Sequence, residues 1–281
     1  MKNIPIGTMI RCADVTEQRI AFYHEIGLDS IQIAGVYETH LATSAVARKN
    51  TDDLCKLLER YSLTVPSMFL SFPNQNWSDA RNGVGLVPES TRTERMLLSC
   101  RQMNWAKRLF GTRYILCHVG WFPEEDTPQF EKIIAELKLL TEFAAANDQM
   151  FLFETGDETV EQFKHILELL DSPAAGVNFD PANLLIYNRD EPAVLLDKMI
   201  GSVKAVHCKD AVRPTPDRSY GKETVLGKGE THFAELLTRL LNCGFSGPLV
   251  IERELPFGPE QENDVRCAVE YIKNIMEMVS V

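Results

Sequence analysis

Phe151-Leu152-Phe153-Glu154 is the first of four segments with the same design in the stretch from Phe151 to Glu254. Each segment is a short apolar run, typical of a buried strand, that stops at a charged or ligand-type residue. The other three are Gly176-Val177-Asn178-Phe179-Asp180, Val203-Lys204-Ala205-Val206-His207 and Leu249-Val250-Ile251-Glu252. Four strands that each deliver an oxygen or nitrogen ligand at the same end predict a metal site at the mouth of a parallel barrel.

The rest of the chain repeats the same alternation of strand and helix. Four further apolar runs are expected as strands at residues 4–10, 29–34, 63–70 and 112–117. Helical spacing of apolar residues follows the eight strands in turn, at residues 16–26, 51–61, 89–110, 129–147, 158–170, 192–200, 231–243 and 260–278. Eight such units in 281 residues predict an α/β protein, a (β/α)8 TIM barrel, with residues 1–281 forming a single domain.

Two connections are long, at residues 72–89 and 210–229. Loops of this length are uncommon in compact domains, so we expect them either to close a site or to build an interface. The second loop carries the basic residues Arg213, Arg218, Lys222 and Lys228, and Lys209 directly precedes it. These cations indicate either a site for a phosphorylated or carboxylated substrate or a solvated surface loop. His40 precedes the helix at residues 51–61 and is expected in an exposed loop.

Composition excludes several classes of partner. A net charge of −11 argues against nonspecific binding to nucleic acid or to an anionic membrane. No run of about eighteen apolar residues is present, and residues 1–7 lack the apolar core of a signal peptide. The 7 cysteines are scattered without a C-x-x-C pair, which predicts reduced thiols in a cytoplasmic protein.

Glu154, Asp180, His207 and Glu252 follow consecutive strands, so we expect them to converge on one half of the barrel mouth. Three carboxylates and one imidazole form a hard, oxygen-rich ligand set. This set favours Mn²⁺ first and Mg²⁺ next, and Co²⁺, Fe²⁺ or Zn²⁺ are also compatible with it. Each carboxylate taken alone is equally typical of a helix cap or a salt bridge, and the histidine of a core hydrogen bond. The four together favour the metal site.

Several motifs in the second half of the chain carry a family resemblance. They are Phe153-Glu154-Thr155-Gly156, Phe179-Asp180-Pro181-Ala182-Asn183, His207-Cys208-Lys209-Asp210, Leu226-Gly227-Lys228-Gly229 and Gly247-Pro248-Leu249-Val250-Ile251-Glu252. With these motifs the sequence resembles the xylose-isomerase-like TIM-barrel superfamily of sugar and sugar-phosphate isomerases and epimerases. Ketose 3-epimerases, hydroxypyruvate isomerases and inosose dehydratases are among its members, and the endonuclease IV fold is a more distant relative.

The resemblance implies that the same four residues are metal ligands and that Glu154 and Glu252 also form an acid/base pair. A divalent ion that holds the carbonyl and hydroxyl oxygens would stabilise an enediolate, while one glutamate removes a proton and the other returns one. Substrate contacts are expected from His118, Lys209, Asn183 and Trp121. The alternatives are that His118 packs against Trp121, Lys209 pairs with Asp210, Asn183 caps the next helix, and the loop aromatics Trp77, Trp121 and Phe122 are plain packing.

The leading hypothesis is a divalent-metal-dependent isomerase or epimerase of a small sugar or related ketone. An inosose-dehydratase-type lyase would use the same site but expel a β-hydroxyl after proton abstraction. A hydrolase of abasic DNA needs more histidines than the 6 present, and the acidic charge opposes DNA binding. A catalytically silent binding protein would not need the four ligands. A small carbohydrate is the expected partner, and a homo-oligomer, a dimer or a tetramer, is compatible with the long loops.

Overall fold

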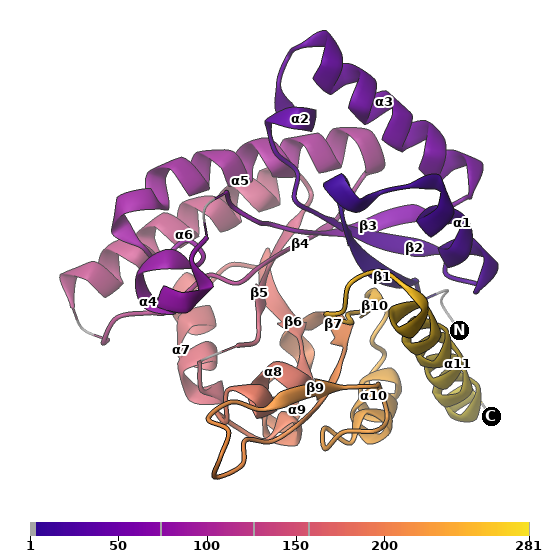
Figure 1. Cartoon of the computed structure of the whole chain (residues 1–281). Helices are drawn as coiled ribbons and strands as arrows, with labels where there is room; N and C mark the ends of the chain where they lie inside the picture. The colour runs from indigo at the N-terminus through magenta and orange to yellow at the C-terminus, as the bar shows by residue number, and fades with distance from the viewer. Residues whose placement is uncertain (1–3, 74, 126, 157, 281) are drawn as a thin grey trace.

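The computed structural model describes residues 4–73, 75–125, 127–156 and 158–280, in which eight parallel strands form a closed barrel (Figure 1). The barrel closes through parallel pairing of the first and last strands, with Ile6 opposite Leu249. This confirms the predicted (β/α)8 fold. The strands are β1 (Ile6–Arg11), β2 (Ser30–Ala34), β3 (Thr64–Phe69), β4 (Tyr114–Cys117), β5 (Met150–Glu154), β6 (Ala175–Phe179), β7 (Val203–Cys208) and β10 (Leu249–Ile251).

The helices that follow these strands surround the barrel (Figure 1). Side-chain oxygens of Thr16, Ser44, Thr127 and Thr159 accept backbone N–H groups in four of the first turns, which stabilises each helix start. The helix that Ser44 caps begins at Ala45, earlier than the predicted start at residue 51. The helices are α1 (Glu17–Glu25), α3 (Ala45–Arg60), α5 (Glu89–Phe110), α6 (Pro128–Ala146), α7 (Val160–Leu170), α9 (Pro192–Met199), α10 (Phe233–Asn242) and α11 (Pro259–Ser280).

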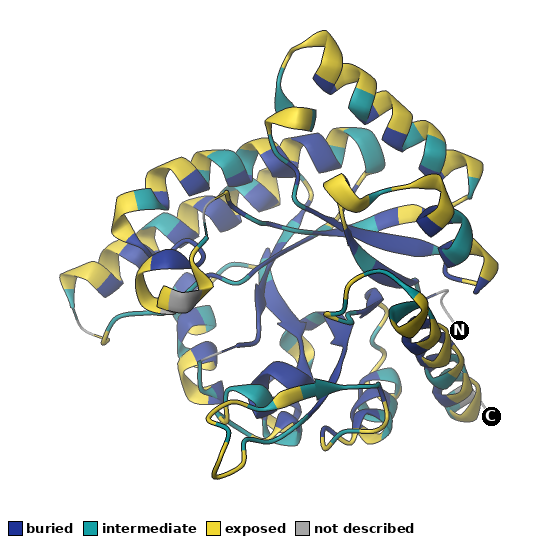
Figure 2. Ribbon diagram, viewed as in Figure 1, coloured by how far each residue is buried: buried dark blue, intermediate teal, exposed yellow. Residues whose placement is uncertain are grey.

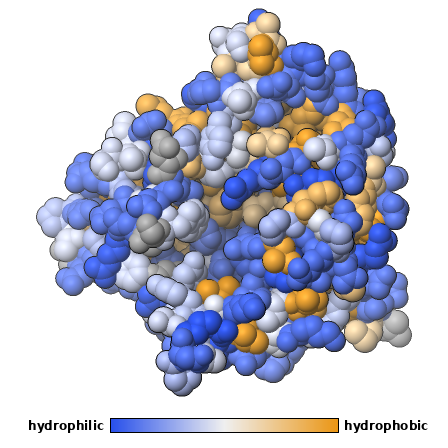
Figure 3. Space-filling view, in the orientation of Figure 1, coloured by the Kyte–Doolittle hydropathy of each residue, from blue (hydrophilic) through white to orange (hydrophobic). Residues whose placement is uncertain are grey.

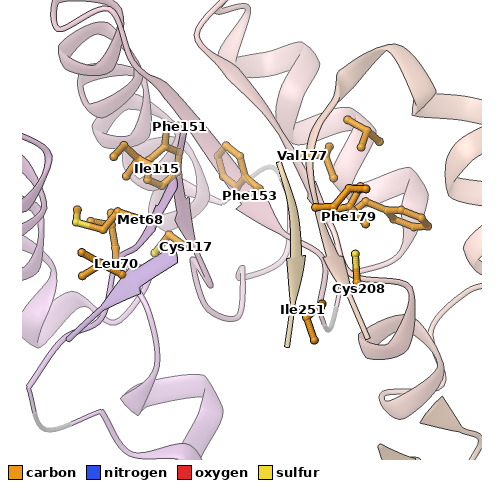
Figure 4. Close-up of a cluster of buried hydrophobic side chains, with 14 of the residues drawn as sticks. Met68, Leu70, Ile115, Cys117, Phe151, Phe153, Val177, Phe179, Cys208 and Ile251 are labelled. Carbon is orange, nitrogen blue, oxygen red and sulfur yellow. The ribbon is translucent and has the colours of Figure 1, made fainter. Parts of the chain in front are cut away.

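The strands are buried on both faces, whereas the helices expose their outer faces (Figure 2). Successive residues of a strand point to opposite faces, so one set packs against the helices and the other fills the barrel. The outer set is apolar and includes Met68, Ile115, Phe151, Phe153 and Phe179 (Figure 4). The inner set has a small apolar cluster of Leu116, Leu152 and Ala205. Polar inner residues lie at the carboxyl ends of the same barrel, among them Gln32, Asn178 and His207.

Several short elements occur where the sequence predicts loops. The short helix α2 (Glu38–Leu41) contains His40, which is half-buried with its ring 6.1 Å from that of Trp105. The expectation of an exposed loop histidine was therefore wrong. The other short helical elements are η1 (Cys12–Asp14), η2 (Trp77–Asp79), α4 (Ala80–Gly83), α8 (Pro181–Ile186) and η3 (Ile200–Ser202).

The long connection after β7 is an ordered hairpin of β8 (Asp210–Val212) and β9 (Lys222–Thr224). Asp210 anchors its two ends, because its carboxylate accepts N–H groups from Gly227, Gly229 and Thr231 at 2.9–3.2 Å. A Cβ at Gly229 would lie 2.2 Å from Asp210 Oδ1, so this approach requires glycine. The hairpin is therefore held against the carboxyl end of the barrel.

The connection after β3 is tied to the end of β4. Leu86 and Val87 donate their N–H groups to the carbonyl oxygen of Val119 at 2.6 and 3.0 Å. A Cβ at Gly85, where φ is +70°, would lie 2.2 Å from that same oxygen. This close approach fixes the connection beside the end of β4, where the ring of Trp77 lies 5.8 Å from that of His118.

The surface and the thiols agree with the composition. The face seen in Figure 3 is mostly hydrophilic, with small separate apolar areas. No helix within the described ranges is long and apolar enough to cross a membrane. The cysteines are free, and burial raises the pKa of Cys12 to about 12, so this thiol is a poor nucleophile.

Candidate metal centre

Four ligand-type side chains meet at the carboxyl end of the barrel. Glu154 ends β5, Asp180 follows β6, His207 lies near the end of β7 and Glu252 follows β10. One ligand atom from each lies within 4.8 Å of the other three. His207 Nδ1 lies 2.9 Å from Glu154 Oε1, 2.7 Å from Glu252 Oε2 and 4.0 Å from Asp180 Oδ2. The convergence expected from the sequence is present in the fold.

Burial of this cluster indicates that it is built for a cation. The side chains of Glu154, Asp180 and His207 are inaccessible to solvent, and that of Glu252 is 11% exposed. With His207 neutral and unprotonated at Nδ1, the buried atoms Glu154 Oε1, Asp180 Oδ2 and His207 Nδ1 find no hydrogen-bond partner among the described residues. Unpaired buried polar atoms are costly, and a divalent ion bound by oxygen and imidazole ligands would satisfy all three. The donor set therefore fits such an ion.

Two residues on β2 and β3 orient the imidazole of His207. Gln32 donates from Nε2 to Ser67 Oγ at 3.0 Å, so its carbonyl oxygen faces His207 Nε2 at 2.9 Å. That oxygen can only accept, and Nε2 must therefore carry the imidazole proton. In the neutral imidazole, Nδ1 is then left with its lone pair directed at the carboxylates. Such outer partners commonly fix the tautomer of a metal-ligating histidine.

The two carboxylate oxygens of Asp180 have different partners, one in the backbone of α8 and one in the cluster. Oδ1 accepts the N–H groups of Ala182 and Asn183 at 2.8 and 3.1 Å and caps helix α8, while Oδ2 faces the cluster. The helix cap and the metal ligand were alternatives at the sequence level, and the structure accommodates both. Pro181 at the first position of α8 presets the helical backbone directly after Asp180.

Glu154 and Asp180 are also held by their neighbours. Asn178 donates from Nδ2 to Glu154 Oε2 inside the barrel. Thr155 Oγ1 donates to the carbonyl oxygen of Asp180 and accepts its N–H, both at 2.8 Å. Asn183 donates from Nδ2 to the carbonyl oxygen of Thr155 at 3.0 Å, so it joins the ends of β5 and β6. The alternative that Asn183 caps the next helix was wrong, because Asn183 lies inside α8, which Asp180 caps, and the residue at the N-cap of α9 is Glu191.

Lys209 follows β7 and supplies a buried cation beside the cluster. Its Nζ lies 3.6 Å from Glu252 Oε1 and 3.8 Å from Asp180 Oδ2, and it donates a hydrogen bond to Glu254. The alternative pairing with Asp210 was wrong, because that carboxylate is committed to the hairpin backbone. Lys209 therefore faces the site and not the loop.

The charges shift the pKa values of the group strongly. Burial acts to lower the pKa of His207, but the carboxylates of Glu154 and Glu252 outweigh it and raise this pKa well above its ordinary value. Burial raises the pKa of Asp180. Burial acts to raise the pKa of Glu252, but Lys209 and His207 lower it. With His207 neutral, three carboxylates and one ammonium leave two negative charges, which a divalent ion balances.

The remaining predicted site residues lie in two places. His118 follows β4 with its ring 5.6 Å from Phe69 and 5.8 Å from Trp77, and Phe69 in turn stacks on His207. Burial lowers the pKa of His118, which favours the neutral imidazole. The alternative that His118 packs against Trp121 was wrong, since its aromatic neighbours are Phe69 and Trp77.

Trp121 belongs to a separate cleft between the loop after β4 and helix α7. The guanidinium carbons of Arg81 and Arg189 lie 4.7 and 5.3 Å from its ring centre. The cleft is lined by Trp121, Phe122, Pro123, Glu125, Phe130, Glu158, Gln162, Ile166 and Arg189. None of the four clustered ligands is part of this lining, so Trp121 is not brought to the cluster itself.

Two inner residues, Ser67 and Asn178, support the site although no motif of the sequence marks them. Ser67 and Asn178 are fully buried polar residues inside otherwise apolar strands. Strand alternation could have identified them as inward-pointing, because Ser67 lies two residues from Phe69 and Asn178 two residues from Asp180. Gln32 alternates with the apolar Ile31 and Ile33 in the sequence, but its partner His207, 175 residues away in the chain, could not be predicted.

The fold and the cluster together define the class of the protein: a TIM barrel with a buried carboxylate and histidine group at the carboxyl ends of its strands. The sequence model of the xylose isomerase-like TIM barrel family matches residues 20–275, and the chain belongs to this family. The resemblance stated from the motifs is thereby confirmed.

Curated relatives match part of the chain. A stretch of 112 residues is 29% identical to an inosose dehydratase of Bacillus thuringiensis (strain Al Hakam) and covers 36% of this chain and 37% of that protein. A stretch of 139 residues is 26% identical to an inosose dehydratase of Clostridium tetani (strain Massachusetts / E88), with 45% and 46% covered. The matches thus span less than half the length of these relatives.

Solved structures match the whole chain. A xylose isomerase domain protein from Planctomyces limnophilus superposes with a TM-score of 0.88 at 27% identity over 99% of both chains. A D-tagatose 3-epimerase-like protein superposes with a TM-score of 0.75 at 19% identity, covering 100% and 98%. The second match shows the fold alone. The expectation of an enzyme is confirmed at this coarse level, because the curated relatives are named dehydratases.

Proposed function

We propose that the protein is a divalent-metal-dependent isomerase or epimerase of a small sugar or related ketone, acting by proton abstraction next to a carbonyl group. The observation that carries the proposal is the placement of two glutamates around one ligand atom. Glu154 and Glu252 lie 2.9 and 2.7 Å from His207 Nδ1, and their strands β5 and β10 are separated by β6 and β7. Carboxylates that reach a substrate from separate strands can serve its two faces.

The four clustered residues are proposed as the metal ligands, with Mn²⁺ favoured over Mg²⁺, Co²⁺, Fe²⁺ and Zn²⁺. The ion, when bound, supplies positive charge against the negative charge that develops on the substrate oxygens. Glu154 and Glu252 are the proposed acid/base pair. Glu252 is the more exposed of the two, at 11% of its side chain, and so is the carboxylate more open to a substrate.

Other residues are proposed to hold the substrate. Lys209 offers an ammonium group at the edge of the cluster, and His118 offers a neutral imidazole beside Trp77. Asn183 has its Nδ2 committed to Thr155, so its contribution is to shape the floor of the site. Trp121 is proposed to act at the outer cleft, where a larger substrate would extend. Together these groups would recognise hydroxyl oxygens and the apolar face of a sugar.

The second candidate is a lyase that removes water after the same proton abstraction. It is favoured by the curated relatives, which are named inosose dehydratases. In this reaction Glu154 or Glu252 would take the proton, and a protonated neighbour such as Lys209 would assist the departing hydroxyl group. The site residues are the same in both candidates, so the product distinguishes them.

The experiment that tests the proposal measures metal content and then substrate C–H exchange in D₂O. Ketoses, phosphorylated ketoses and inosose are incubated with the metal-loaded protein, and exchange is followed by NMR. Exchange with an isomeric product supports the isomerase, and exchange with a dehydrated product supports the lyase. Glu161→Gln, a surface substitution on α7, is the control that should retain exchange. A protein that binds no divalent ion would contradict both candidates.

The setting of the reaction is also part of the proposal. The protein would work in the cytoplasm on a small-molecule carbohydrate, without nucleic acid or membrane as partner, in keeping with its acidic charge and free cysteines. A homo-oligomer, either a dimer or a tetramer, is proposed on the two long connections at the mouth. Sedimentation analysis of the purified protein tests the oligomeric state.

A further inference from the structure

A chain of contacts connects the metal centre to the hairpin after β7. Lys209 Nζ reaches the edge of the cluster at Glu252 and Asp180, and its third partner is Glu254, which lies outside the ligand set. The side chain of Lys209 is 2% exposed, whereas that of Glu254 is 61% exposed. The ammonium group is thus held between an inner pair of carboxylates and one outer carboxylate.

The backbone of Glu254, which carries the outer carboxylate, is held by the hairpin. The backbone N–H of Glu254 donates to both carboxylate oxygens of Glu223 on β9, at 3.1 and 3.2 Å. Arg253 Nη1 lies 3.1 Å from the same carboxylate, and Arg253 Nε donates to Asp264 of α11 at 2.9 Å. Glu223 and Arg253 are each only 13% exposed. The segment after β10 is therefore fastened on both sides, and Glu254 is placed against Lys209.

We propose that Glu254 is a positioning residue of the metal centre, which holds the ammonium of Lys209 outward so that it balances charge without competing for the ligand oxygens. An ammonium group and a divalent ion are attracted to the same two carboxylates, those of Asp180 and Glu252. The contact with Glu254 draws Lys209 away from them, and Glu223 transmits the position of the hairpin to this contact. The inference rests on the proposed metal centre and adds a means by which the hairpin sets metal affinity.

Three variants test whether Mn²⁺ affinity changes in the direction that the positioning role of Glu254 predicts. In Glu254→Gln, Lys209 loses its outer charge partner and moves toward Asp180 and Glu252, so affinity for Mn²⁺ should fall by about tenfold. In Lys209→Met the competing charge is absent, and affinity should rise by about tenfold or more. The double variant should bind Mn²⁺ like Lys209→Met alone, because Glu254 acts through Lys209.

The measurement is isothermal titration of the metal-free protein with MnCl₂, together with thermal unfolding to confirm that each variant is folded. Glu161→Gln, which removes another exposed carboxylate that pairs with a lysine, is the matched control and should leave the affinity unchanged. Glu223→Gln keeps Lys209 and Glu254 in the chain and provides a second test. It should lower the affinity in the same direction as Glu254→Gln.

The outcomes separate this inference from the proposed function. If the unaltered protein binds no Mn²⁺, the proposed metal centre is wrong and the inference falls with it. If the unaltered protein binds Mn²⁺ and neither Glu254→Gln nor Glu223→Gln weakens binding, only the positioning role is overturned. A Glu254→Gln effect of the same size with and without Lys209 would also overturn it, because the carboxylate would then act directly on the ion.

Discussion

Replacement of Gln32 by methionine tests whether His207 is held as a metal ligand from across the barrel. The substitution keeps the length of the side chain but removes the oxygen that faces His207 Nε2 at 2.9 Å and the donor to Ser67 Oγ at 3.0 Å. The buried imidazole N–H is then left without an acceptor, which costs about 1–3 kcal/mol of folding stability. Loss of an outer partner of a metal-ligating histidine typically lowers metal affinity by about 10–100-fold. We expect both effects in Gln32→Met.

The assay combines titration with MnCl₂ and urea unfolding of the metal-free protein. Gln149→Met is the matched control, because Gln149 is also buried and donates from Nε2 to the carbonyl oxygens of Met103 and Thr112 at 3.1 and 3.0 Å. It should lose a similar amount of stability, about 1–3 kcal/mol, but keep its Mn²⁺ affinity. Unchanged Mn²⁺ affinity in Gln32→Met would refute the orientation of His207 by Gln32.

Three further predictions concern catalysis, pH and the barrel interior. Glu154→Gln and Glu252→Gln should each abolish substrate C–H exchange in D₂O with the fold intact by circular dichroism; retained exchange would remove that residue from the acid/base pair. In the metal-free protein the pKa values of His207 and Asp180 are raised, so protons compete with the ion at these two groups. Mn²⁺ affinity should therefore rise with pH until both groups are deprotonated. Titrations with MnCl₂ at a series of pH values check this, and an affinity that does not change with pH would contradict it. Leu152→Ala empties part of the inner apolar cluster and should cost about 2–5 kcal/mol in urea unfolding, and a loss below about 1 kcal/mol would mean that the interior repacks.

Asp180 illustrates how local sequence and tertiary structure combine at this site. The Asp-Pro sequence after an apolar strand is a local signal for a helix start, since the carboxylate caps the helix and proline fits its first turn. The short helix α8 that results was nevertheless missed, because a helix of six residues has too few positions for an apolar period. The second role of Asp180, facing His207, depends on β6 and β7 being neighbours in the barrel.

Sequence periodicity by itself determined the eight strand and helix units and the four ligand-type residues at strand ends. These features are local, because the alternation of a strand and the spacing of a helix are written within a few residues of each other. The parallel barrel then follows from the repeated order of the units, and its carboxyl ends meet at one mouth.

Only the tertiary structure decided which polar residues meet inside that mouth. Gln32 faces His207 because β1 joins β2 to β10 and so closes the barrel, which brings together residues 175 positions apart. Lys209 donates to Glu254 and not to the adjacent Asp210. The carboxylate of Asp210 already accepts five backbone and hydroxyl donors from the hairpin and the residues that follow it. Hydrogen-bond partners of this kind are chosen by distance in space after closure, and no period in the sequence encodes that distance.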